Sequence, residues 1–395
     1  MWQVEGGGQR GEGGGDGIAD EIAAPWIGRL TVRGNRRDGR DGDFEAGMDL
    51  DGADRRGMSL GSATVAGTLD RGLWDVEADV GTIRAGATAA GWTLDAEGSV
   101  NSLDATDALA GSAAAEYFGR ISTRGALSAG ISATGADDRR GQSIASLSAG
   151  SVQDVSLTVL GGIGSITVSQ WIDGPDGDTD GGTITAGWLD RLTTRADRRA
   201  GTDGDFAAHL TLTGIGAPDR KAVLGTVTIA GSLIEAVWHV AGDVSRLTVR
   251  QVADHCQVGA TGSIASITAA AAYGSDFLAG VLQKVLDDRD RCADAPGDFE
   301  PGSEASIGSI RIGGWRLVVG DPTRFVQDSN FSAPSFGAVR LTNAGGGAAY
   351  GLHVLGSETN IRSVQHTDTL NKTDSWTWRP GDTFRIVGSL HLTVV

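Results

Sequence analysis

A six-residue pattern of apolar and polar positions recurs along most of the chain. It reads apolar, small, Ser/Thr/Arg, apolar, polar, apolar, as in Ile-Gly-Ser-Ile-Thr-Val from Ile163. This period of two predicts that each copy forms a short β-strand with one face buried. The fourteen copies begin at Ile27, Leu60, Val80, Val100, Phe118, Ile144, Ile163, Leu189, Leu224, Val244, Ile264, Ile307, Phe336 and Ile361.

The spacing of the copies indicates how the strands are arranged. The shortest spacings are 18, 19 and 20 residues, and a second alternating run lies between copies, as in 73–76 and 237–240. These runs usually end in glycine, which tolerates the strained backbone of a corner. We therefore predict an all-β fold, a single-stranded parallel β-helix (solenoid) with coils of about 20 residues and inserted loops. An antiparallel sandwich or propeller remains the alternative, although its hairpins would favour Asn-Gly or Asp-Gly turns.

A larger duplication overlies these coils. The segment that starts at Trp26 matches the segment that starts at Trp188 at an offset of 162, and the match continues at 164, where Trp74 pairs with Trp238. Because Trp74 and Trp238 alternate with polar neighbours, we expect both in the core. The duplication predicts a flexible Gly-rich lead over 1–25, a first β-helix unit over 26–187, a second unit stacked on it over 188–366, and a C-terminal strand or capping segment over 367–395.

Composition and charge limit the kinds of binding partner that we expect. The 395 residues include 62 glycines, and 50 Asp and Glu against 33 Lys and Arg give a net charge of −17. Because the arginines are also scattered along the sequence, we do not expect nucleic acid as a partner. No apolar run reaches the length of a membrane span, so none is expected. The first twenty residues lack a signal-peptide core, which indicates either a cytosolic protein or a trimmed chain.

One acidic segment has the spacing of a calcium loop. Asp176, Asp178 and Asp180 alternate before Gly181, as in the front half of such a loop, although the twelfth position is Gly187 rather than a closing glutamate. Alternating carboxylates around a turn place several oxygens on one hard cation. The alternative is a solvated turn in which the aspartates accept backbone N–H groups.

Gly-Asp-Phe occurs three times, in or beside inserted loops. In two copies a further aspartate stands two residues before the central one, which gives the pairs Asp41 and Asp43, and Asp203 and Asp205. These pairs are candidate calcium ligands between a loop and the coils. We favour the structural interpretation, in which Gly makes the turn, Asp accepts backbone hydrogen bonds and Phe anchors the loop.

A catalytic site would need clustered acids on one face. Asp75, Asp95 and Asp104 are candidates for neighbours on adjacent coils, but their equivalents in the second unit are His239, Gln257 and Thr268. No serine or cysteine nucleophile motif is present. We therefore favour a protein without enzymatic activity over a hydrolase or lyase.

The stacked pattern, the Gly-Asp-Phe loops and the tandem duplication resemble the glycine-rich parallel β-helix repeat proteins of bacterial cell surfaces, including autotransporter-passenger-like adhesins. The resemblance covers roughly residues 26–366 and implies a secreted or cell-surface setting. Because a signal sequence is missing, it further suggests a fragment of a longer secreted chain. We expect a non-enzymatic structural or adhesive β-solenoid, with a polysaccharide-active β-helix enzyme or carbohydrate-binding module as the alternative. The implied partners are polysaccharide or cell-surface components. The alternating run at 390–395 also predicts end-to-end self-association.

Overall fold

The computed structural model describes residues 2–5, 21–34, 41–137, 139–173, 181–197, 199–218, 222–287, 293, 295–314, 325–344, 350–369, 375–382 and 390–395. The fold is all-β, as predicted. The chain divides into two compact units, of which unit 1 contains Met1–Val168 and Gly182–Gly187, and unit 2 contains Ser169–Gly181 and Trp188–Val395. The predicted stacking of one unit on the other stays a prediction.

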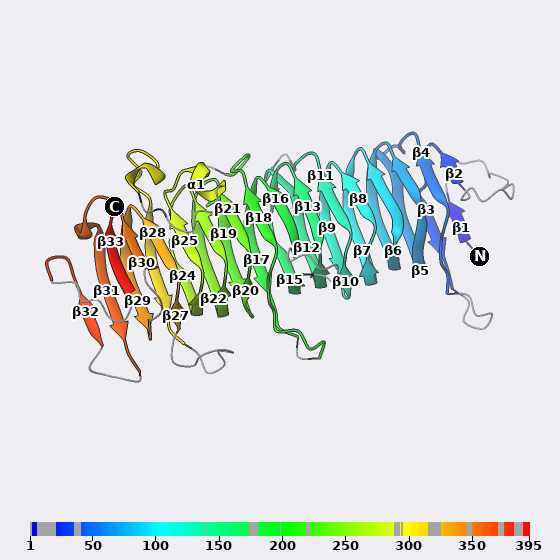
Figure 1. Ribbon diagram of the computed structural model, residues 1–395. Helices are drawn as coiled ribbons and strands as arrows, with labels where there is room; N and C mark the ends of the chain where they lie inside the picture. The colour runs from blue at the N-terminus through cyan, green and yellow to red at the C-terminus, as the bar shows by residue number, and fades with distance from the viewer. Residues whose placement is uncertain are drawn as a thin grey trace. The chain divides into compact units, whose positions relative to one another are not determined.

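In unit 1 the strands pair in parallel along three ladders (Figure 1). Register shifts after Val65 and after Leu69 divide the pairing of β5 with β6 into three segments, one for each ladder. The first ladder contains β3 (Arg29–Val32), the starts of β5 (Met58–Val76), β6 (Asp79–Ala96) and β7 (Ser99–Leu109), then β9 (Tyr117–Thr123), β12 (Gln142–Gln153) and β14 (Gly162–Ile163).

The other two ladders of unit 1 continue the same chain path. The second contains the middles of β5 and β6, the ends of β7 and β12, and β10 (Ala126–Leu127). The third contains β2 (Glu21–Ala24), β4 (Gly47–Leu50), the ends of β5 and β6, β8 (Ser112–Ala115), β11 (Gly130–Ala133), β13 (Val155–Val159) and β16 (Gly182–Ala186). In addition, β1 (Trp2–Glu5) pairs antiparallel with β3.

Unit 2 has the same three kinds of ladder. The first contains β17 (Trp188–Thr194), β19 (Leu224–Ile229), β22 (Val244–Asp254), β24 (Ile267–Tyr273), β26 (Ser306–Ile312), β29 (Ser335–Thr342) and β31 (Ile361–Thr367), and ends with β32 (Trp376–Trp378), which is antiparallel to β31. The second contains β20 (Leu233–Ile234), the ends of β22 and β24, and β27 (Val326–Gln327). The third contains β18 (His209–Leu212), β21 (Val237–Val240), β23 (Gln257–Ala260), β25 (Asp276–Ala279), β28 (Asn330–Ala333), β30 (Tyr350–Val354) and β33 (Leu390–Val394).

The remaining described elements are one strand and three short helical segments. β15 (Ile166–Ile172) runs from unit 1 into unit 2. The described helical segments are short: α1 (Gln283–Asp287) and 3-10 turns at Pro296–Asp298 and Glu358–Asn360.

The fourth position of the six-residue pattern is the inward one in both units. It pairs with the same position of the next strand, as Ile83 pairs with Leu103 and Ile310 with Val339, and these side chains are buried. Because side chains alternate along a strand, the third and fifth positions face outward. The pattern therefore decides which residues of the first ladder meet solvent.

The duplicated residues make equivalent contacts within each unit. The ring centroids of Phe44 and Trp74 lie 6.0 Å apart, and those of Phe206 and Trp238 lie 5.8 Å apart, both edge to face. Trp74 and Trp238 are fully buried, which confirms the expectation that they pack in the core. Each donates its indole N–H to a backbone carbonyl two residues after the phenylalanine.

Candidate functional site

The candidate site is a group of arginines on the outward face of the first ladder in unit 2. We define the arginine site as Arg311 on β26, Arg340 on β29, Arg362 on β31 and Arg379 directly after β32, together with the polar side chains of Ser363, Gln365 and Thr377. Alternation places Arg311, Arg340 and Gln365 there, because Ile310, Val339 and Val364 point inward and are buried. Arg362 follows the buried Ile361 and is exposed as well. All four arginines are exposed.

The register brings this polar row together across the strands. Arg311 lies opposite Arg340, Arg340 opposite Gln365, and Gln365 opposite Thr377. Neighbouring strands are about 4.8 Å apart, so one member of the row follows another at that interval. Arginines 29 residues apart in the sequence thus become direct neighbours.

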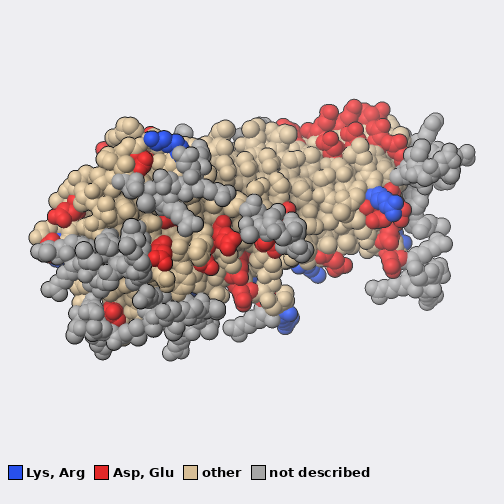
Figure 2. All heavy atoms as spheres, viewed as in Figure 1, with Lys and Arg blue, Asp and Glu red and all other residues tan. Residues whose placement is uncertain are grey.

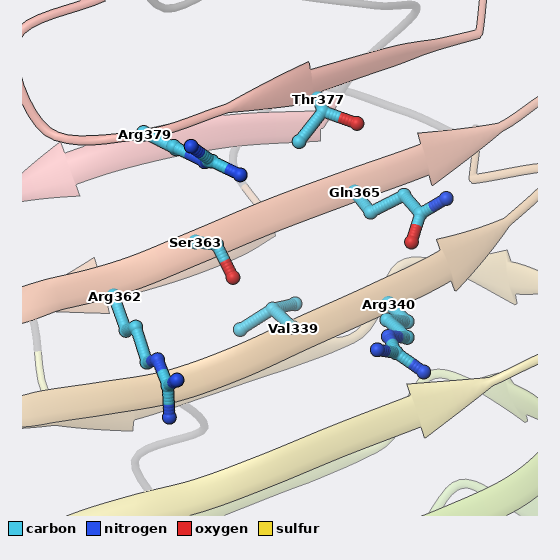
Figure 3. A pocket seen from close by; sticks show the side chains of 7 residues that line it. All are labelled: Val339, Arg340, Arg362, Ser363, Gln365, Thr377 and Arg379. Carbon is cyan, nitrogen blue, oxygen red and sulfur yellow. The ribbon is translucent and has the colours of Figure 1, made fainter.

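Most of these residues line one open pocket with a volume of about 310 Å³. Figure 3 shows Arg340, Arg362 and Arg379 on neighbouring strands around it, with Ser363, Gln365 and Thr377. A guanidinium presents a planar fork of N–H donors that matches carboxylate, sulfate or phosphate oxygens. The hydroxyls and the amide supply donors and acceptors for neutral hydroxyl groups.

Among the described residues, these arginines lack the counter-charge that two outward arginines of unit 1 have. In the part of the chain that the structure describes, no carboxylate forms an ion pair with the guanidinium of Arg311, Arg340, Arg362 or Arg379. In unit 1, by contrast, Asp104 lies 3.6 Å from Arg84 and 3.4 Å from Arg120. The arginine site is therefore a local positive region in a chain of net charge −17.

Arg362 also departs from the pattern that surrounds it. It occupies the second position, which holds a small residue in most copies. Gly337 has the same position one strand earlier, and a Cβ there would clash with the carbonyl oxygen of Gly308. The last copy instead carries a long exposed cation. This exchange places one more positive charge at the pocket.

The pocket has no groups for acid–base chemistry among its lining residues. The described lining residues include no carboxylate, histidine or cysteine. Elsewhere, burial raises the pKa of the Cys256 thiol to about 12, although a hydrogen bond with Ser275 opposes the shift, so this buried cysteine stays protonated and unreactive at neutral pH.

The sequence-predicted calcium ligands divide into two groups. Asp176, Asp178 and Asp180 lie outside the described residues. Asp41, Asp43, Asp203 and Asp205 are described, in loops beside the ladders. In the described part of the chain, no group of three or more His, Cys, Asp or Glu is arranged to hold a metal ion. Calcium binding stays a prediction.

The Gly-Asp-Phe loops show the structural contacts that we favoured. Asp43 Oδ1 accepts from the backbone N–H of Thr68 at 2.6 Å, and Asp205 Oδ1 from Ser232 at 2.6 Å. The preceding glycines, Gly42 and Gly204, have φ values of 85° and 84°, which favour glycine. Phe44, Phe206 and Phe299 are buried.

Burial raises the pKa of Asp205, and the nearby Asp203 carboxylate raises it further. The hydrogen bond from Ser232 opposes this shift.

The three acids considered for catalysis do not form one cluster. Asp75 lies opposite Asp95, and Asp49 opposite Asp75, on the third ladder of unit 1, where Figure 2 shows carboxylates gathered at the upper right. Asp104 lies on the first ladder instead, where it accepts from Ser102 at 2.8 Å and from Ser122. The prediction that Asp104 neighbours Asp75 and Asp95 was therefore wrong, because the first and third ladders face different sides.

Sequence reasoning missed the arginine site. It treated the arginines as scattered, which holds along the chain but not on this face. A signal was present, because Arg311 and Arg340 both occupy the fifth, outward position of successive copies.

No helix in the described residues is both long and apolar enough to cross a membrane. Searches of known protein families, of functionally described proteins and of solved structures find no match to this chain.

Proposed function

We propose that each unit is a single-stranded parallel β-helix and that the protein is a non-enzymatic binding protein, secreted or at a cell surface, which holds an anionic partner at the arginine site. The fold proposal is supported by three parallel ladders in each unit and by the pairing of equivalent pattern positions from strand to strand. Such an arrangement presents long, regular outer faces.

One observation carries the binding function. Three consecutive strands of the first ladder each place an arginine at the surface, and Arg379 directly follows the next strand. None of the four has a described carboxylate partner, although the chain as a whole is acidic. Like charges in neighbouring strands disfavour folding unless another interaction compensates. A bound anion supplies that compensation, and the exposed arginines leave room for it.

The test measures binding of the full chain to a panel of acidic and neutral polysaccharides. Biolayer interferometry at physiological ionic strength provides the measurement. We expect acidic members to bind, and Arg340→Gln combined with Arg362→Gln to reduce binding at least tenfold. Arg29→Gln, which removes one exposed arginine of unit 1, is the matched control. Unchanged binding by the double variant would remove the arginine site from the function.

The alternative is a polysaccharide-active enzyme. Its supporting observation is the pair of exposed carboxylates Asp75 and Asp95, held in register on adjacent strands. Mass spectrometry of the same panel after long incubation separates the two functions. New short oligosaccharides that disappear with Asp75→Asn would favour the enzyme, whereas an intact panel with retained binding supports our proposal.

A further inference from the structure

We infer that the arginine site binds an acidic polysaccharide chain that crosses the strands, with its carboxylates meeting the arginines of successive strands. This inference rests on the proposed binding function and specifies its ligand and the direction in which the ligand lies. It is carried by how the cations are distributed over the face.

The distribution of the arginines sets the direction. β26, β29 and β31 each carry a single arginine, Arg311, Arg340 and Arg362, and Arg379 follows β32. A chain that followed one strand would therefore meet one cation. A chain that crossed the strands would pass Arg311 and Arg340, which are opposite each other and about 4.8 Å apart. It would reach Arg362 and Arg379 by crossing obliquely, because Arg362 lies three residues, roughly 10 Å, before the Gln365 that is opposite Arg340.

The side chains between the arginines indicate sugar hydroxyls. Gln365 lies opposite both Arg340 and Thr377, and Ser363 is two residues from Gln365 on the same face of β31. A uronic-acid polymer carries a carboxylate and several hydroxyls on every unit, so its groups match this mixed row of guanidiniums and short polar side chains.

Nucleic acid fits the same row less well. The described residues that line the pocket include no aromatic side chain on which a base would stack. The net charge of −17 also opposes a polymer with a dense phosphate backbone more strongly than one with sparser carboxylates. We therefore favour the carboxylated polysaccharide, and a nucleic acid or a sulfated chain becomes an outcome of the test.

The experiment is a length series of oligouronates, from one to eight sugar units, titrated into the full chain by isothermal calorimetry. We expect affinity to rise with length and to level off at roughly four or five units, where the chain spans the four arginines. Arg340→Gln should weaken all lengths beyond the monomer by roughly tenfold. Arg311→Gln should weaken the pentamer as well, because Arg311 lies at one end of the arginine site.

Each other result has a defined meaning. Equal affinity for monomer and pentamer, or indifference of the pentamer to Arg311→Gln, would overturn the direction. Tighter binding of a sulfated oligosaccharide or of single-stranded DNA, abolished by the same arginine variants, would overturn the carboxylate assignment and leave the arginine site as the binding site. Oligouronate binding that is insensitive to all four arginines would contradict both proposals. Since the four side chains are exposed, unchanged circular dichroism and Tm will show that the variants fold.

Discussion

Asp75 lies directly opposite Asp95 in the parallel pairing of β5 with β6. Asp49 stands opposite Asp75 in turn, so three exposed carboxylates follow one another across three strands. Like charges in this position repel each other, and salt screens the repulsion.

Replacing the central acid should therefore stabilise the protein. We expect Asp75→Asn to raise the free energy of unfolding by about 0.5 kcal/mol at low ionic strength, and the gain to vanish in 1 M salt. Urea denaturation at the two salt concentrations measures it. Asp107→Asn, which removes the same charge from an exposed position on β7, is the control, and an equal gain there would mean that only the net charge matters.

Asp104 should contribute stability that depends on pH. Burial raises its pKa, but hydrogen bonds from Ser122 and Ser102, together with Arg120 and Arg84, outweigh burial and hold the pKa of this carboxyl below its usual range. A pKa lower in the folded state than in the unfolded state means stability that is present above about pH 4 and lost as the pH falls through the folded-state value.

We expect Asp104→Asn to cost about 1 kcal/mol at pH 7, since the flanking arginines are largely exposed, and much less near pH 2. Thermal unfolding of both proteins from pH 2 to 7 provides the measurement. A difference that stays constant over this range would show that the charge of Asp104 does not matter.

Gly337 should not tolerate a side chain. A Cβ there would clash with the carbonyl oxygen of Gly308 on the neighbouring strand, so β26 and β29 would have to separate. We expect Gly337→Ala to lower the free energy of unfolding by about 2–4 kcal/mol in urea denaturation. Gly130→Ala, on β11, is the control, because a Cβ at that position meets nothing within 4 Å. Equal effects of the two substitutions would contradict the close approach of the strands at Gly337.

Asp205 should matter as a hydrogen-bond acceptor rather than as a charge. Asp205→Ala leaves the Ser232 N–H without its acceptor. Measured in EDTA, the free energy of unfolding should fall by about 1–3 kcal/mol. Because the pKa of Asp205 is raised on folding, its ionisation opposes the folded state as the pH rises through that value. Asp205→Asn keeps an acceptor without the charge, and we expect it to be at least as stable as the wild type at pH 7. Equal losses for Ala and Asn would assign the effect to the charge.

Calcium binding has a separate check at the same loop. If Asp203 and Asp205 hold calcium, millimolar calcium raises the Tm of the wild type, and Asp203→Asn abolishes the increase. Asp107→Asn should retain it. No increase for the wild type would leave only the structural role of the loop.

The sequence by itself determined which residues point inward and which outward. Alternation along a strand is a local consequence of backbone geometry, so the buried fourth positions, Trp74, Trp238 and the Gly-Asp-Phe anchors could all be predicted from short segments. The neighbours across strands could not, because loops of different lengths separate successive strands and only the completed pairing fixes which residues lie opposite. That pairing set Asp104 between Arg84 and Arg120, away from Asp75, and it placed Arg311 beside Arg340. The arginine site is thus a product of register, in which distant residues meet only when the ladder forms.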